Sequence, residues 1–101
     1  MARAFIINSR DDVVTLSEPA RRGEAVQWEA EGKTCRLAAR DDIPRFHKMA
    51  LRFVRRGTPV LKYGESIGRA VCDIEPGSHV HVHNISDMPE PLSERGAEQR
   101  Q

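Results

Sequence analysis

The sequence contains few aromatic residues, has two cysteines, and has no long apolar run. Its 101 residues include three phenylalanines, one tryptophan and one tyrosine, and 39% of the chain is hydrophobic. A chain of this length holds one domain with one modest core, which here must be built mainly from Val, Ile, Leu and Ala. We therefore expect a single small domain that gains further burial against a partner.

The cysteines and the apolar pattern limit where the protein works. Cys35 and Cys72 show no metal-binding or redox spacing, so we expect two reduced thiols of the kind found in cytosolic proteins. No apolar stretch is long enough to span a bilayer, and the N-terminus lacks a signal-peptide pattern. These absences predict a cytoplasmic protein without a membrane partner.

The net charge is only +1, but it is spread unevenly. Residues 1–85 carry 14 Lys/Arg against 11 Asp/Glu, giving +3, and residues 86–101 carry 2 against 4, giving −2. An excess of +3 is too weak to indicate nucleic acid as a partner, yet it is compatible with a site for a small anion. Residues 86–101 lack apolar periodicity and are rich in polar residues and Pro, which predicts a disordered tail after a domain of residues 1–85.

Short apolar runs alternate with turn residues at intervals of roughly ten residues, which is typical of an all-β fold. Glu31-Gly32 separates two such runs and predicts a hairpin. No internal repeat is evident at the periods of helical repeats or propellers. We expect strands at residues 4–7, 13–16, 25–29, 34–37, 47–53, 60–63, 69–74 and 79–85.

Three of the four histidines alternate with valines at positions 79, 81 and 83. A strand has a period of two, so the three imidazoles would leave one face and the valines the other. On a straight strand the outer histidines would be about 13 Å apart, so one metal ion could bind two of the three. The third could bind substrate or transfer a proton. The alternative is an exposed edge strand without a functional site.

His47 and Lys48 are a second candidate pair, just after a chain break at residues 43–44. Lysine could supply a point charge for a carboxylate, and histidine a hydrogen-bond donor or a general base. The alternative is a polar pair at the end of a strand. Lys62, Tyr63 and Arg69 are weaker candidates.

Several short motifs follow one another in a characteristic order between residues 41 and 85. They are Asp42-Ile43-Pro44, His47-Lys48-x-Ala50-Leu51, Gly57-x-Pro59-Val60-x-Lys62-Tyr63-Gly64-x-x-Ile67-Gly68-x-Ala70 and Asp73-Ile74-x-x-Gly77-x-His79-Val80-His81-Val82-His83-Asn84. This order resembles the SAF-type N-terminal domain of the altronate and galactarate dehydratase family. In some members that domain is a separate small subunit, as in the alpha subunit of sulfolactate sulfo-lyase. Residues 1–40 fit only in length and in their strand-and-turn character.

The resemblance implies a β-clip fold and a metal-dependent elimination, with iron(II) or manganese as the divalent metal and most of the catalytic machinery on a larger subunit. His81 and His83 would then be the metal ligands or catalytic proton donors. His47, Lys48, His79 and Asn84 would bind the substrate, a small anionic hydroxy acid. One departure bears on the substrate: the family usually has Gly directly before the His-Lys pair, where this chain has Phe46.

The expected function is that of the small subunit of a carbon–oxygen lyase, which dehydrates a sugar acid such as altronate to a 2-keto-3-deoxy acid. Such a subunit would not be active alone. Three alternatives remain open at this point. They are the alpha subunit of a sulfolactate sulfo-lyase, a stand-alone SAF ligand-binding module without catalysis, and a β-rich homo-oligomer whose histidines lie at an interface.

Overall fold

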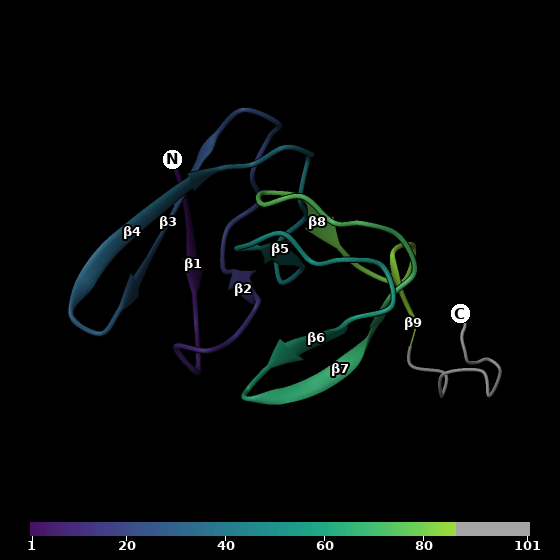
Figure 1. The fold of residues 1–101 in the computed structure, drawn as a ribbon. Helices are drawn as coiled ribbons and strands as arrows, with labels where there is room; N and C mark the ends of the chain where they lie inside the picture. Colours follow the sequence, from purple (N-terminus) through teal and green to yellow (C-terminus); the bar gives the residue numbers. More distant parts are fainter. Residues whose placement is uncertain (87–101) are drawn as a thin grey trace, which may run out of the picture.

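The computed structural model describes residues 1–86, which form nine short strands in two sheets and no helix (Figure 1). This confirms the prediction of a single small all-β domain. With no helix in this part of the chain, none is present there that could cross a membrane. The predicted disorder of the tail concerns residues 87–101, which lie outside the described residues. Ser86, assigned to that tail from the sequence, belongs instead to the last strand.

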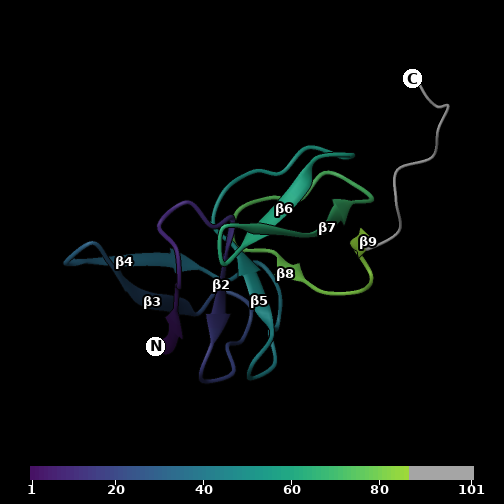
Figure 2. The same ribbon diagram turned by 90° about the horizontal axis from the view of Figure 1, so that it is seen from below.

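The larger sheet has six strands in the order β4-β3-β1-β2-β5-β8, and β1 and β3 are its only parallel neighbours within the described residues. Its strands are β1 (Ala2–Phe5), β2 (Val13–Leu16), β3 (Ala25–Ala30), β4 (Lys33–Ala38), β5 (Lys48–Ala50) and β8 (His79–Val80). The smaller sheet has the order β6-β7-β9, formed by β6 (Pro59–Lys62), β7 (Glu65–Ala70) and β9 (Ile85–Ser86). Figures 1 and 2 show the β6–β7 hairpin in a layer of its own beside β5 and β8.

Strand β2 lies between two hydrophobic clusters, and every one of its residues is buried. Val14 and Leu16 pack into the first cluster, whereas Val13 packs into the second. This follows from the alternation of side chains along a strand that is covered on both faces. The first cluster is Ala2, Val14, Leu16, Ala20, Val26, Trp28, Ala39, Ile43 and Met49, and the second is Val13, Ala50, Val54, Val60, Ala70, Ile74 and Val80.

The hairpin predicted around Glu31-Gly32 is confirmed. Strands β3 and β4 pair from Ala25↔Ala38 to Ala30↔Lys33, and the hairpin projects from the rest of the domain (Figures 1 and 2). Glu31 and Gly32 have φ angles of 51° and 77°. Positive φ at both central residues is the two-residue turn whose twist matches that of the flanking strands.

One tight turn recurs four times, and its copies bind each other in pairs. Ala20 and Ile43 exchange backbone N–H···O hydrogen bonds of 2.9 and 2.8 Å, and Val54 and Ile74 do the same at 2.9 and 2.8 Å. These four residues are 23, 11 and 20 positions apart along the chain. A search for a fixed period therefore finds no repeat, although the structure contains one.

Each copy of this turn places a residue with positive φ three positions after its bridging residue. Glycine fills the position in three copies, with φ of 86–89°, whereas Phe46 fills it in the second copy with φ of 67°. In every copy the backbone N–H of this residue donates to a backbone carbonyl in a strand or directly after one. The Phe46 N–H, for example, donates to the Leu16 oxygen at 2.7 Å. The Phe46 side chain is 62% exposed, so little packing offsets the strain of this backbone conformation.

The single strand predicted for residues 79–85 is wrong. The chain leaves β8 after Val80, turns, and re-enters a sheet at Ile85 as β9. Asn84 closes the turn: its Oδ1 accepts from the His81 backbone N–H at 3.0 Å, and its Nδ2 donates to the His79 carbonyl at 2.7 Å. The two valines consequently differ, because Val80 is fully buried and Val82 is 80% exposed.

We expect Phe46→Gly to stabilise the domain by about 1 kcal/mol, because glycine adopts positive φ without the steric cost of a Cβ. Urea unfolding measures the change. Gly23→Ala is the matched control: it adds a Cβ at φ +89° where no atom lies within 4 Å, so it isolates the backbone term and should cost about as much. A loss of stability in Phe46→Gly would show that the contacts of the Phe46 ring stabilise the fold by more than the backbone strain destabilises it. One such contact is with the Arg45 guanidinium, 4.6 Å from the ring centre.

Candidate functional site

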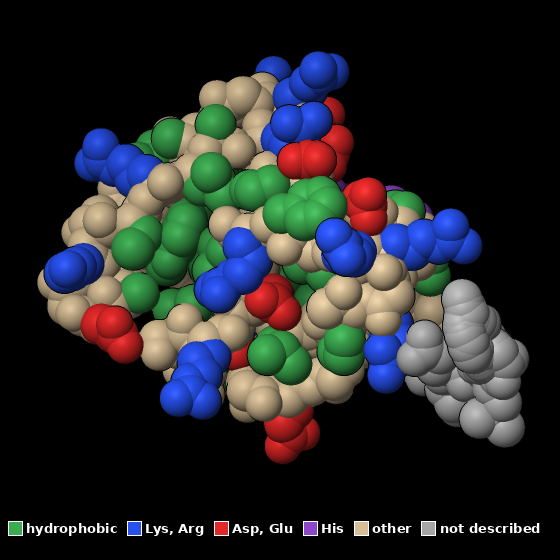
Figure 3. Space-filling model, in the orientation of Figure 1, with side chains coloured by type: hydrophobic (Ala, Val, Ile, Leu, Met, Phe, Trp, Pro, Cys, Tyr) green, Lys and Arg blue, Asp and Glu red, His purple; other side chains and the backbone are tan. Residues whose placement is uncertain are grey.

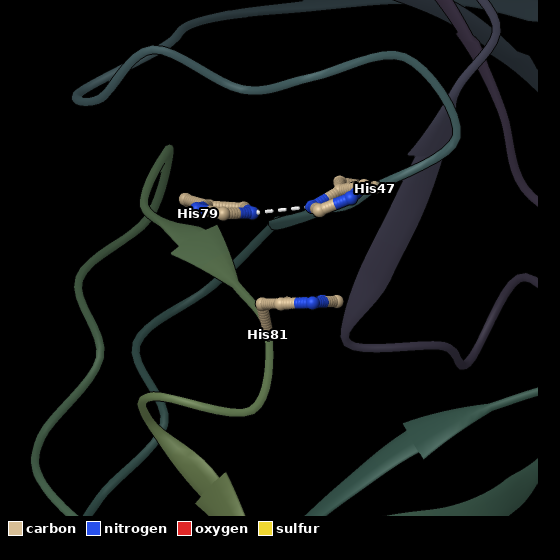
Figure 4. A group of neighbouring side chains, drawn as sticks. All are labelled: His47, His79 and His81. Carbon is tan, nitrogen blue, oxygen red and sulfur yellow. Dashed lines mark hydrogen bonds between the residues drawn. The ribbon is translucent and has the colours of Figure 1, made fainter.

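The pairing of β5 with β8 brings histidines from distant parts of the chain together. His47 immediately precedes β5, and His79 is the first residue of β8. The two strands are antiparallel, with Lys48 opposite Val80 and Met49 opposite His79. His81 follows β8 directly, and Figure 4 shows its ring beside those of His47 and His79. We call these three residues the histidine cluster.

The rings of the histidine cluster are in direct contact. His47 Nδ1 lies 2.8 Å from His79 Nε2, a hydrogen bond in which one ring donates and the other accepts. The His47 and His81 rings stack with centroids 4.2 Å apart. One ring nitrogen from each histidine lies within 4.8 Å of the others. Asp41 Oδ2 accepts the His79 backbone N–H at 2.9 Å and so fixes the start of β8.

His83 and Asn84 are near the cluster but differ from it. The His83 ring lies 5.1 Å from that of His79 and is tilted by 40°, and the residue is exposed. It is outside the group whose nitrogens converge. Asn84 is 6% exposed and uses both polar atoms of its side chain inside the turn. The Asn84 side chain therefore stabilises the turn. Its contact with substrate stays a prediction.

The surroundings favour neutral imidazoles. Burial lowers the pKa of His79, and the nearby His83, His47 and His81 lower it further, partly offset by Asp41. Desolvation also lowers the pKa of His81, as do the charges of His47, Lys48 and His83. An imidazole must be neutral to offer its lone pair to a metal ion. Both shifts therefore favour the form of His79 and His81 that can bind a metal ion.

Three convergent imidazoles fit a transition-metal ion such as iron or zinc, and a vacant coordination position could take a substrate. The sequence pattern assigned the metal to His81 and His83, whereas the geometry groups His81 with His47 and His79. The difference arises because the chain turns after Val80. The motif spacing held no signal that His47 and His79 would meet, since their contact spans 32 residues.

The weaker candidates have different surroundings. Arg69 donates from Nη1 to the Gly57 carbonyl at 2.8 Å, which links β7 to one of the recurring turns. Lys62 lies at the end of β6, with Nζ 4.6 Å from the centre of the Tyr63 ring. Lys48 is half-buried, and burial followed by the charge of Lys62 lowers its pKa.

An open apolar hollow of about 430 Å³ lies beside the turn of residues 81–84. Val82 contributes to it and projects into solvent from between His81 and His83. We call it the β7–β9 hollow, and its lining is Ile67, Val71, Val82, Ile85 and Ser86. In Figure 3 little histidine is visible, at the upper right behind other side chains.

The fold and the site together define a small all-β domain that presents an imidazole cluster at an open surface. The particular family follows from sequence comparison: residues 2–88 match the family described as the altronate/galactarate dehydratase SAF domain. The chain belongs to this family. The match extends well beyond residues 41–85, where the resemblance was visible, and takes in the N-terminal strands.

The chain is similar to two kinds of curated protein. It is 53% identical over 49 residues to the (2R)-sulfolactate sulfo-lyase subunit alpha of Paracoccus pantotrophus, covering 48% of this chain and 73% of the relative. The corresponding subunit of Chromohalobacter salexigens is 35% identical over 84% of this chain and 95% of its own. The altronate dehydratase of Escherichia coli strain K12 is 40% identical over 81% of this chain.

The matches differ in how much of each relative they include. The chain spans only 17% of the Escherichia coli altronate dehydratase and 16% of the 37%-identical altronate dehydratase of Bacillus subtilis. It therefore corresponds to one part of those enzymes.

The histidine cluster predicts the effect of single substitutions on metal affinity. Replacing His47, His79 or His81 by Ala should weaken binding of a divalent probe ion such as Co²⁺ by at least about tenfold each, because each change removes one of three ligands. His83→Ala is the matched control and should change the affinity little. Calorimetric titration of the chain with CoCl₂ measures this, and equal losses in all four variants would contradict the grouping.

The metal-free chain should lose stability as the pH falls. Below the ordinary histidine pKa of about 6.5 the unfolded chain binds protons at positions 79 and 81 that the folded chain resists, so the free energy of unfolding decreases from there downward. Urea unfolding in EDTA between pH 7.5 and 5 tests this. The variant with both His79→Gln and His81→Gln should show a shallower decrease, and an unchanged slope would rule out these two histidines as its source.

Proposed function

We propose that this chain is the accessory subunit of a lyase that eliminates a β-substituent from a 2-hydroxy acid. The observation that carries the proposal is the histidine cluster, in which one ring nitrogen from each of three histidines converges. Such an elimination needs a group that binds a carboxylate and a hydroxyl and stabilises the charge that develops on them. Imidazole ligands that hold a metal ion suit this task.

His47, His79 and His81 would hold a divalent metal ion. Imidazole ligands favour iron(II) over manganese, which prefers oxygen ligands. When bound, such an ion supplies Lewis-acid stabilisation to carboxylate and hydroxyl oxygens. The hydrogen bond between His47 and His79 supports this assignment, because it holds two of the ligands close together in advance.

The other polar residues have separate tasks in this proposal. The Lys48 ammonium attracts the substrate carboxylate as a point charge. His83, exposed beside His79, can give a proton to the leaving group or take one from the substrate. Asn84 positions His79 and His81 through the turn it closes.

The elimination itself is balanced without a redox partner. A base takes the proton on the carbon next to the carboxylate, the electron pair forms a carbon–carbon double bond, and the β-substituent leaves with its bonding electrons. The enol that results becomes a 2-keto acid. The remaining catalytic groups would come from a larger subunit, which the naming of two relatives as an alpha subunit supports.

Two leaving groups fit this scheme. A hydroxide leaves from a sugar acid such as altronate and needs an acid to protonate it. A sulfite leaves from sulfolactate and needs less help. Sequence identity does not separate the two, because it is 53% over 49 residues and 35% over 89 residues to the two sulfolactate sulfo-lyase subunits, and 37% and 40% to the altronate dehydratases.

The β7–β9 hollow is the surface we assign to the larger subunit. A valine that is 80% exposed next to two histidines of the site is unfavourable in water, and burial against a partner would remove that cost. A stand-alone ligand-binding module or a homo-oligomer would leave this surface without a catalytic partner.

We expect a larger subunit to co-purify with the tagged chain from its native host. Val82→Asp should abolish this co-purification, because it places a charge in the contact, and should leave the fold intact. The matched control is Ile7→Asp, which also replaces an exposed apolar residue by aspartate, in the loop between β1 and β2. This loop lies on the side of the domain opposite β9 (Figures 1 and 2).

The recovered complex is then assayed for release of sulfite from sulfolactate and of a 2-keto acid from altronate. Activity on either acid that falls in His81→Ala supports the proposed lyase. Recovery of the chain alone under mild conditions would favour the ligand-binding module. Recovery of the chain bound only to copies of itself, in a manner that depends on His81 and His83, would favour the homo-oligomer.

A further inference from the structure

Strand β4 is an open edge of the larger sheet. Counted from the two-residue turn, Lys33, Cys35 and Leu37 form the hydrogen-bonded pairs with β3. The backbone N–H and C=O groups of the residues between them, Thr34 and Arg36, therefore point away from β3. Within residues 1–86 no second strand pairs with β4, and no hydrogen bond satisfies these outward groups. Both residues are exposed, so another strand can pair here.

Two of the other sheet edges are closed by side chains. On β8 the Asp41 carboxylate accepts the His79 N–H at 2.9 Å, and the Asn84 amide donates to the His79 carbonyl at 2.7 Å. On β6 the side chain and the backbone of Asp12 bind the Leu61 N–H and carbonyl, each at 2.9 Å. The remaining edge, β9, is two residues long. Because closed or short edges resist pairing with another chain, β4 is the edge suited to it.

One face of the β3–β4 hairpin is apolar and only partly covered. Trp28 is paired with Cys35, and Val26 with Leu37, and side chains of directly opposite residues share a face. Figure 3 shows hydrophobic side chains gathered over β1 and β3. The half-buried residues that pack against the first hydrophobic cluster on or next to these strands are Ala4, Ile6, Ala30, Cys35 and Leu37. A strand added to β4 would extend this face and cover its outer border.

The sequence of β4 fits a second copy of itself. In an antiparallel pair with a two-fold axis at Cys35, Thr34 of each copy lies opposite Arg36 of the other, so both residues with outward backbone groups form hydrogen bonds. An axis at Arg36 would place two guanidinium groups opposite each other. It would also need the Ala38 carbonyl, which Gly77 already covers, because a Cβ on Gly77 would lie 2.5 Å from that oxygen. An axis at Thr34 would extend the pairing into the tight turn.

The charges are complementary in the register centred on Cys35. Thr34 Oγ1 donates to Glu29 Oε2 at 2.7 Å, so Glu29 lies beside Thr34 on the polar face of the hairpin. Arg36 of the second copy, opposite Thr34, would face this carboxylate. Neither Arg36 nor Glu29 forms an ion pair within residues 1–86. Two symmetric ion pairs across the axis therefore favour a second copy of this chain over a strand without a matching charge.

We propose that the chain forms a two-fold symmetric dimer in which β4 pairs with β4 of a second copy, centred on Cys35. Strands β4 and β8 are the two ends of the six-stranded sheet. Figures 1 and 2 show β4 far from both β8 and β9, so the dimer leaves the histidine cluster and the β7–β9 hollow accessible. Each dimer thus presents two separate histidine clusters.

Sedimentation equilibrium of the full chain measures the dissociation constant of the dimer. Thr34→Pro removes an outward N–H and no hydrogen bond to β3, and proline is tolerated on an edge strand. We expect association to be at least about tenfold weaker. Thr34→Val is the matched control: it also removes the hydroxyl but keeps the N–H, and should dimerise like the wild type. A monomeric wild type, or a dimer that Thr34→Pro leaves intact, would overturn the proposal; in the first case the edge is left to the larger subunit.

Cross-linking tests the register without a change to the edge. Directly opposite residues in a non-hydrogen-bonded antiparallel pair have Cα atoms about 4.5 Å apart, which is within the range of a disulfide. Diamide takes up the two protons and two electrons that two thiols release. It should link the Cys72→Ser chain through Cys35 and give much less dimer with Cys35→Ser, in which the exposed Cys72 is the remaining thiol. Equal yields from the two variants would overturn the register.

Charge reversal tests the ion pairs. Arg36→Glu should weaken the dimer about tenfold, because it places a carboxylate opposite Glu29 of the second copy. Glu29→Arg should weaken it similarly. The chain with both changes should recover most of the wild-type association, since the same pairs then form with their charges exchanged. A double variant as weak as the single ones would overturn the proposed arrangement.

Discussion

The mutual hydrogen bonding of two pairs of tight turns is the constraint on which the site depends. Ala20 and Ile43 bind each other, as do Val54 and Ile74. His47 is four residues after Ile43, and His79 is five residues after Ile74, so each histidine enters its strand from one of these turns. The chain directions at the site are therefore set by backbone contacts within the domain, and the imidazoles do not have to hold the backbone themselves.

The hydrogen bond between His47 and His79 stabilises the site and also holds two potential metal ligands close together. One of the two rings donates a proton to the other across 2.8 Å, which holds the rings close without a metal ion. A bound cation would take the place of this hydrogen bond once the donor ring carries its proton on its other nitrogen. It would find the rings already near one another, so little side-chain entropy would be lost on binding. In this respect the cluster is preorganised for an ion.

The sequence was sufficient to predict the all-β fold, a strand at Val13–Leu16 and the hairpin at Glu31-Gly32, because each depends on local pattern. It did not predict the break after Val80. Alternating histidine and valine is what a straight strand would have. The turn depends on the Asn84 side chain together with the backbone N–H groups of Asn84 and Ile85, which donate to the His81 carbonyl. The β-clip classification and the individual roles of the site residues stay predictions.

The tie between Asp11 and the β6–β7 hairpin has an evolutionary consequence. Because the hairpin tip is anchored to the loop before β2, its outward residues can vary while β5 and β8 keep their pairing. Inherited changes in this hairpin could then alter the surface of the smaller sheet without disturbing the imidazoles. A domain divided in this way offers one route by which a common scaffold could come to serve enzymes with different substrates.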